Sequence, residues 1–196
     1  MDSPVVHPDV FVHIRIIVGM VLGLSVSRLI TGLTRFVQHP KRERIYPIHL
    51  GWCLFLLLSI IHFWWYEFGL ATIRHWTFEL YFFVILYAVL FATIASLLFP
   101  DRMEEYSGYE DYFQSRRRWF YGLLAVMFLV DMVDTAVKGS EHFHSLGIEY
   151  PIRQSAFAIC SIIAMFVPGK TYQAIFVSIG LVYQAWWILR LFDALS

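Results

Sequence analysis

Charged side chains inside long apolar stretches are the residues of this chain with the clearest capacity for chemistry. Arg28, Glu67, Asp131 and Asp134 all lie in predominantly apolar sequence. An ionised group is costly to place in hydrocarbon, and those that occur there pair with one another or mark routes for protons and ions. We therefore expect these residues to face a protein interior, where proton or ion handling is the chemistry that they could perform.

Uncharged polar residues accompany these charges at helical spacing, as Ser59, His62 and Tyr66 do on one helix face. The candidate intramembrane polar site comprises Arg28, His62, Tyr66, Glu67, Asp131, Asp134 and Gln184. If these side chains converge, they line a polar cavity open to the outside. The alternative is a set of interhelical salt bridges and hydrogen bonds that only fixes helix packing.

Depth and spacing predict two ion pairs within this set. Arg28 lies about 12 Å and Asp131 about 18 Å from the inner ends of their helices, so a long arginine side chain could bridge the difference. Asp134 can pair locally with Lys138, which follows it at the i,i+4 spacing of neighbouring helix positions. The first pair would join two helices, and the second would be structural.

Other chemistries have weaker support in the sequence. A membrane heme needs facing histidines at one depth, which makes His13 with His62 the one conceivable pair and heme-based redox chemistry a remote alternative. The set of His62, Asp131 and Asp134 lacks the spacing of a known metal site. No GxSxG, HExxH or phosphate-binding glycine loop occurs. We expect no cofactor, no metal and no enzymatic activity, although acid–base catalysis by Asp131 or Glu67 stays open.

The composition indicates that membrane helices position these residues. Of 196 residues, 59% are hydrophobic and 15% are charged, against roughly 45–50% apolar and 25% charged in soluble domains. So little charge could not cover so much apolar surface in water, whereas a bilayer removes the conflict. The 15 basic and 15 acidic residues balance, so we expect lipid and no nucleic acid as the partner.

The predicted fold is an all-α polytopic membrane bundle, one domain over residues 1–196, with six transmembrane helices plus one interfacial amphipathic helix. Each span has close to the roughly 17–25 residues that a bilayer requires. The spans are 11–36, 46–69, 78–99, 119–137, 151–167 and 171–192. The interfacial helix covers 103–116, where Tyr106, Tyr109 and Phe113 recur at helical spacing.

The loop charges predict the orientation of the bundle. Nine cations would share one face: Arg35, Lys41, Arg42, Arg44, Arg102, Arg116, Arg117, Arg118 and Lys170. Four would share the other: Arg74, Lys138, Arg153 and Arg190. By the positive-inside rule the nine-cation face is cytoplasmic, and with six spans both termini lie on the extracytoplasmic side.

The first span has two contrasting faces. An apolar stripe, expected to meet lipid, consists of Phe11, Val18, Leu22, Val26, Leu29, Leu33 and Phe36. A small-residue seam recurs every fourth position at Gly19, Gly23, Ser27 and Thr31. Such small-xxx-small patterns allow close helix contact, so we expect the seam to pack against neighbouring helices.

Two stretches resemble known proteins. The run Phe113-x4-Arg118-Trp119-Phe120-x-Gly122-Leu123-Leu124, continued by Asp131-x2-Asp134-Thr135, and the run His62-Phe63-Trp64-Trp65 are similar to small polytopic inner-membrane proteins of bacteria described as hypothetical. The resemblance covers most of the chain. It implies a bacterial inner (plasma) membrane location, and it implies no activity and no catalytic residue.

Two functions are compatible with these patterns. The first is passage of protons, ions or a small solute, with the buried polar residues as relay or gate. Six helices in 196 residues leave little interior, so a pore would require a homo-oligomer. The second is a non-catalytic membrane scaffold or accessory subunit whose buried charges are structural.

Overall fold

The computed structural model describes residues 8–40, 44–73 and 76–193, and every regular element in these ranges is a helix. In chain order they are α1 (Pro8–Gln38), α2 (Pro47–Tyr66), the 3₁₀ helix η1 (Glu67–Thr72), α3 (Phe78–Leu98), α4 (Tyr109–Val137), α5 (Ser140–Ser145), α6 (Glu149–Phe166) and α7 (Lys170–Asp193). The prediction of an all-α fold is confirmed. Lys41, Arg42 and Arg74, which the loop-charge prediction includes, lie outside the described residues.

Five helices are long and apolar enough to cross a membrane. They cover Phe11–Gln38, Pro47–Ala71, Phe78–Leu98, Tyr109–Val137 and Lys170–Arg190. Helix α6 is not among them, because Glu149, Arg153 and Gln154 lower the hydropathy of its 18 residues. The membrane character of the bundle is therefore supported, and five of the six predicted spans are found.

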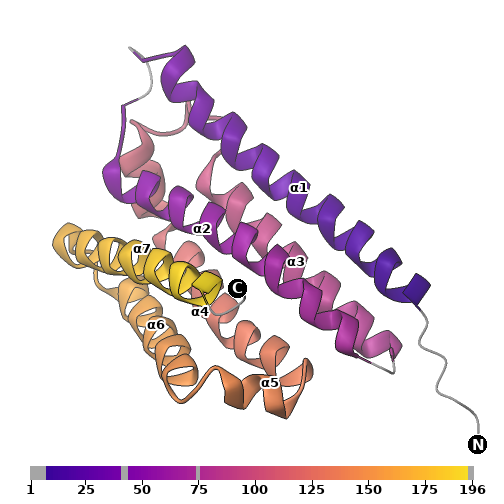
Figure 1. The fold of residues 1–196 in the computed structure, drawn as a ribbon. Coiled ribbons are helices and arrows are strands. Elements are labelled where there is room, and N and C mark those ends of the chain that lie inside the picture. Colours follow the sequence, from indigo (N-terminus) through magenta and orange to yellow (C-terminus); the bar gives the residue numbers. More distant parts are fainter. Residues whose placement is uncertain (1–7, 41–43, 74–75, 194–196) are drawn as a thin grey trace, which may run out of the picture.

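The helices form two groups that meet at α4 (Figure 1). Helices α1, α2 and α3 lie side by side, and α7 packs on α2. Helix α4 contacts α3 on one side and lies against α6 on the other, while the short α5 follows the end of α4. The second half of α4 thus lies between α3 and α6, which is where the candidate residues of α4 are found.

The packed face of α1 is the reverse of the predicted one. The apolar stripe, including Val18, is buried in the core or packed on it. The small-residue seam faces outward, and a Cβ atom added at Gly19 or Gly23 would meet nothing within 4 Å. Close approach occurs instead at Gly32, where an added Cβ would lie 2.3 Å from the Phe99 ring. The prediction was wrong because lipid tails and apolar side chains are chemically alike, so apolarity alone does not identify the lipid face.

The interfacial helix predicted over 103–116 is not a separate element of the described chain. Gly108, with a φ of 149° that favours glycine, precedes α4, which runs unbroken to Val137. Tyr109 and Phe113 are buried, and both rings pack near the ring of His49. Their helical spacing fits an interfacial helix and the first turns of a longer helix equally well, and packing on α2 decides between them.

Candidate functional site

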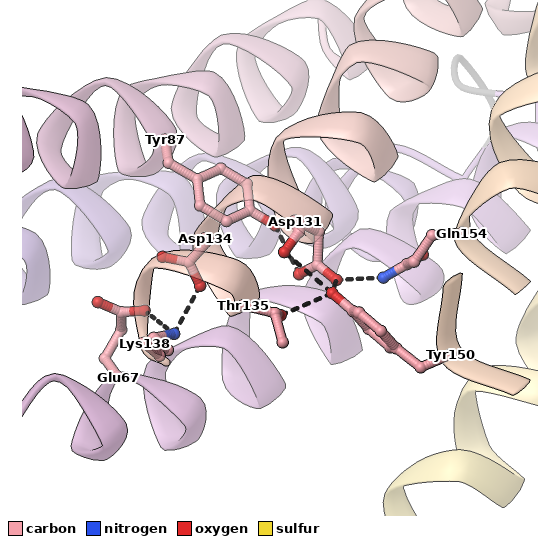
Figure 2. A network of polar contacts seen from close by, with 8 residues as sticks. All are labelled: Glu67, Tyr87, Asp131, Asp134, Thr135, Lys138, Tyr150 and Gln154. Atoms are coloured by element: carbon pink, nitrogen blue, oxygen red, sulfur yellow. Dashed lines mark hydrogen bonds and ion pairs between the residues drawn. The ribbon is translucent and has the colours of Figure 1, made fainter. Parts of the chain in front are cut away.

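A buried ion triad joins the end of α2 to the end of α4. The Lys138 ammonium donates to Glu67 Oε1 at 2.8 Å and to Asp134 Oδ2 at 2.6 Å (Figure 2). The three side chains are only 1–3% exposed. Asp134 and Lys138 are one helical turn apart, whereas Glu67 reaches them from the first residue of η1. The predicted Asp134–Lys138 pair is confirmed, and a second carboxylate shares the same ammonium.

A second cluster surrounds Asp131, one turn before Asp134. Its Oδ1 accepts a hydrogen bond from the Tyr87 hydroxyl at 2.9 Å, and its Oδ2 accepts one from the Tyr150 hydroxyl at 2.6 Å. Gln154 Nε2 also donates to Oδ2 (Figure 2). These donors come from α3 and α6, so Asp131 connects three helices.

A cavity of about 40 Å³ lies between the two clusters. It has room for a few water molecules and is too small for a metabolite. Its polar lining consists of Ser59, His62, Tyr66, Tyr87, Asp131, Asp134, Thr135, Tyr150, Arg153, Gln154 and Gln184. The lining comes from α2, α3, α4, α6 and α7, so closure of this space depends on the whole bundle.

Several buried polar atoms in and beside this cavity have no hydrogen-bond partner among the described residues. Those of the cavity lining are His62 Nε2, Asp134 Oδ1, Arg153 Nε and Nη1, and Gln154 Oε1, and Glu67 Oε2 lies in the adjoining triad. Buried polar groups are almost always hydrogen-bonded in folded proteins, and a polar cavity of this kind holds ordered water or a bound ion. The unpartnered atoms include donors and acceptors, as a chain of waters or a mobile proton would require.

Arg153 is the second cation of the site, and aromatic rings surround it. Its guanidinium lies 4.3 Å from the ring centroid of Trp187, 5.8 Å from that of Tyr150 and 5.9 Å from that of Tyr183. Among the described residues it forms no ion pair with a carboxylate. The charge is held by cation–π contacts with these rings.

The ionisable groups of the site do not balance. Among the described residues the site holds three carboxyl groups, on Glu67, Asp131 and Asp134, and two cationic groups, on Lys138 and Arg153. With neutral histidine and every carboxyl ionised, one negative charge would be left over. Burial of an uncompensated charge costs several kcal/mol, on the order of 3–5 when one partner of a buried pair is missing. A bound proton or cation is therefore needed to close the charge balance.

Toward the other end of the bundle the interior is filled by rings. Trp52 packs against Phe55, Phe120 and Phe176, with ring centroids 5.1–5.5 Å apart. The Trp52 indole N–H also donates to the Tyr121 hydroxyl at 3.1 Å. This aromatic layer, defined by these five residues, lies about 15 Å along α4 from Asp131 at 1.5 Å per residue. It separates the cavity from the opposite end.

A second polar group lies beyond the aromatic layer. Gln114 Nε2 donates to the Tyr46 hydroxyl at 3.0 Å and to Gln173 Oε1 at 2.9 Å. These residues stand at the start of α4, before α2 and near the start of α7, at the end where the predicted cytoplasmic cations gather. The bundle interior thus has two polar zones with an aromatic layer between them.

Most of the predicted site residues come together. His62, Tyr66, Asp131, Asp134 and Gln184 line the cavity, and Glu67 adjoins it through Lys138. Arg28 does not.

The predicted Arg28–Asp131 pair is absent, because Arg28 donates to Asp101 at 2.5 Å and to the Phe99 carbonyl at 2.7 Å. Helix α1 packs on α3, so the arginine reaches the carbonyl and carboxylate at the nearby end of α3. The Asp131 carboxylate is satisfied instead by hydroxyl and amide donors of α3 and α6.

The predicted set of site residues lacked several members of the site, Arg153 among them. Tyr87, Tyr150 and Gln154 bond to Asp131, and Lys138 belongs to the interior although its position predicts a loop. One signal was available in α6. Tyr150, Arg153 and Gln154 recur at i, i+3 and i+4, which places polar groups on one face of an otherwise apolar helix. The tyrosine of α3 gave no signal, because an aromatic ring in a membrane span is ordinary.

Heme and metal binding gain no support from the positions of the histidines. His13 is exposed on α1, whereas His62 lines the cavity. Across the described ranges, no three His, Cys, Asp or Glu side chains are arranged to hold a metal ion.

No protein-family model, curated protein or solved structure matches this chain. The function must therefore be inferred from the site itself.

Proposed function

We propose that this protein is a membrane protein that binds a proton in its buried polar cavity and passes protons across the bilayer. The observation that carries the proposal is the charge balance of the cavity. Three carboxylates face two cations in a region where an unpaired charge is costly. One additional positive charge is required, and a proton is the smallest group that supplies it.

The proton is assigned to the pair Glu67 and Asp134. Both oxygens of Asp131 already accept hydrogen bonds, from Tyr87, Tyr150 and Gln154. Glu67 and Asp134 share one ammonium, and each retains one buried oxygen without a partner. A single proton on either carboxyl satisfies a free oxygen and removes the excess charge.

The size of the cavity narrows the choice of transported species. At about 40 Å³ it accommodates water but no organic solute. Protons move along hydrogen-bonded water and side chains and need no larger passage. His62 and Arg153, which contribute unpartnered nitrogen atoms to the same space, complete the hydrogen-bonding surface for such water.

Transfer to the other side requires passage through the aromatic layer. The Trp52–Tyr121 hydrogen bond is the polar contact of that layer, and the Gln114–Gln173–Tyr46 group lies beyond it. We infer that the aromatic layer is the closed gate, and that opening it would join the two polar zones. Two polar zones separated by a gate are expected in a carrier or gated relay, in which one zone at a time is accessible to protons from its side of the membrane.

A non-catalytic scaffold is the second candidate, and one observation favours it. The carboxylate of Asp131 already accepts three hydrogen bonds, and these connect α4 to α3 and α6. On this interpretation the charged residues fix the register of the helices, and no protons pass through the protein.

Proton flux in reconstituted vesicles separates the two candidates. Vesicles that enclose a pH-sensitive dye are prepared with the wild-type protein, with Glu67→Gln and with Asp111→Asn, whose exposed carboxylate lies outside the cavity. The proposal predicts flux above that of protein-free vesicles, loss of flux in Glu67→Gln and normal flux in Asp111→Asn. Melting curves check that all three proteins are folded. Wild-type flux equal to that of protein-free vesicles would favour the scaffold.

We further infer six spans, with both termini on the extracytoplasmic side of a bacterial inner membrane. Helix α6 extends about 27 Å at 1.5 Å per residue, close to the ~30 Å of hydrocarbon, and its polar face is turned toward α4 and the cavity rather than lipid. Val167–Gly169 then turns the chain directly into α7. A homo-oligomer is compatible with the outward-facing seam of α1.

A further inference from the structure

A groove of about 740 Å³ lies on the outside of the bundle and shares no lining residue with the polar cavity. This volume is within the ~300–1,000 Å³ of ordinary ligand sites. Its floor is the second half of α3, with Thr93 and Ser96, and its walls are α1 at Leu24 and α4 at Trp119 and Leu123. Helices α1 and α4 flank α3 and meet through the rings of Phe36 and Tyr109, outside the groove, while Thr93 and Ser96 on its floor are exposed.

One end of the groove is charged and the rest is largely apolar. Arg28 and Asp101 form an ion pair there at 2.5 Å, with side chains 30% and 86% exposed. The Arg28 Nε is buried without a hydrogen-bond partner. Asp101 uses one carboxylate oxygen for Arg28, and its exposure leaves the other available. The groove thus ends in a partly exposed guanidinium beside a carboxylate whose second oxygen is available.

The position of this end matches a lipid headgroup. Asp101 follows the last turn of α3, close to where the span ends, while Thr93 lies about 12 Å deeper at 1.5 Å per residue. Trp119, whose ring is exposed at the groove wall, is the residue type that favours the membrane interface. A molecule in the groove would therefore place its polar part at the interface and its apolar part along α3.

We propose that this groove binds a phospholipid with a primary-amine headgroup, phosphatidylethanolamine. Its phosphate accepts hydrogen bonds from Arg28, its ammonium donates to Asp101, and one acyl chain lies between α1 and α4 over α3. The fixed cation–carboxylate pair complements a headgroup with one negative and one positive charge. A phosphatidylcholine headgroup carries no N–H donor for Asp101, and phosphatidylglycerol offers only neutral hydroxyl donors, so both lose the charged hydrogen bond to this carboxylate.

Thermal stabilisation by added lipid tests the proposal with the full-length protein in detergent. Phosphatidylethanolamine, phosphatidylcholine and phosphatidylglycerol of identical acyl chains are titrated against wild type, Asp101→Asn, and Asp111→Asn as a control carboxylate outside the groove. We expect phosphatidylethanolamine to bind wild type and Asp111→Asn about tenfold more tightly than phosphatidylcholine, as one charged hydrogen bond of about 1.4 kcal/mol would give. In Asp101→Asn this preference should disappear.

A groove-filling variant, Ser96→Trp, tests the acyl-chain site separately, and it should lower the affinity for all three lipids. Equal affinities for the three lipids in the wild-type protein would overturn the proposal, as would an unchanged preference in Asp101→Asn. Stronger binding of phosphatidylglycerol than of the other two would show a general anion site and would also overturn it. None of these outcomes depends on proton flux, so the lipid site and the proposed function fail or succeed independently.

Discussion

Removal of the Lys138 ammonium is the perturbation with the largest expected effect on the fold. In Lys138→Met the side chain keeps its length and loses its charge, and Glu67 and Asp134 are left facing each other. Both carboxylates are at most 3% exposed and lose a hydrogen bond of 2.8 Å or 2.6 Å. Neither the bilayer nor the packed interior supplies a replacement donor.

The magnitude follows from the burial of the triad. Breaking a buried ion pair by removing one partner costs about 3–5 kcal/mol, because the remaining charge stays desolvated. We expect the free energy of unfolding to fall by about this amount at neutral pH. The loss should be smaller at acidic pH, because protonation neutralises the carboxylate of the pair that stays ionised at neutral pH in the folded state.

Unfolding in detergent, followed by the fluorescence of the seven tryptophans, measures this difference. Lys170→Met is the matched control, because Lys170 pairs with Glu110 on the surface, with both side chains at least half exposed. It should unfold like wild type.

The triple variant Lys138→Met, Glu67→Gln, Asp134→Asn removes all the triad charges together and should recover much of the loss. The reasoning fails if Lys138→Met unfolds like Lys170→Met, or if its stability decreases as the pH falls from neutral.

Two further predictions concern α1 and the topology. Gly32→Ala should destabilise the protein by about 1–3 kcal/mol through overpacking, since the new Cβ would meet the Phe99 ring at 2.3 Å. Gly23→Ala, where the Cβ meets nothing within 4 Å, should be neutral or stabilising. Equal effects of the two substitutions on unfolding in detergent would contradict the observed face of α1. Single cysteines can be placed at positions 107 and 140 in a variant that lacks Cys53 and Cys160. A membrane-impermeant thiol reagent should label them from opposite sides of the cell membrane, position 140 from the outside. Labelling of both positions from one side would exclude the proposed orientation.

Local features of the site were predictable from the sequence, and features that depend on helix neighbours were not. The Asp134–Lys138 pair follows from i,i+4 spacing, which any helix imposes. The partner of Arg28 depends on which helix packs against α1, and spacing contains no such information. The comparison of depths predicted Asp131 as the partner of Arg28, whereas Arg28 pairs with Asp101 at the end of α3.

The orientation of helices in the bundle was the main source of error. The bulky face of α1, with Val18 and Leu22, packs inward, and the seam of small residues faces out. In water, apolarity identifies the buried face, but in a bilayer both environments are apolar. The polar residues were better guides, because five of the seven predicted site residues line one cavity and Glu67 adjoins it. Hydrocarbon makes exposure of such groups costly, so their convergence is imposed by the solvent.

The state of the Glu67–Asp134 pair can be read directly by infrared spectroscopy, because a protonated carboxyl has a carbonyl band that a carboxylate lacks. We predict one such band in the folded wild-type protein at neutral pH, from a buried carboxyl whose proton exchanges slowly with solvent. It should vanish in both Glu67→Gln and Asp134→Asn, because either change removes the excess negative charge, and it should persist in Asp101→Asn. Absence of the band in the wild type, or its survival in both cavity variants, would contradict the assignment of a bound proton to this cavity.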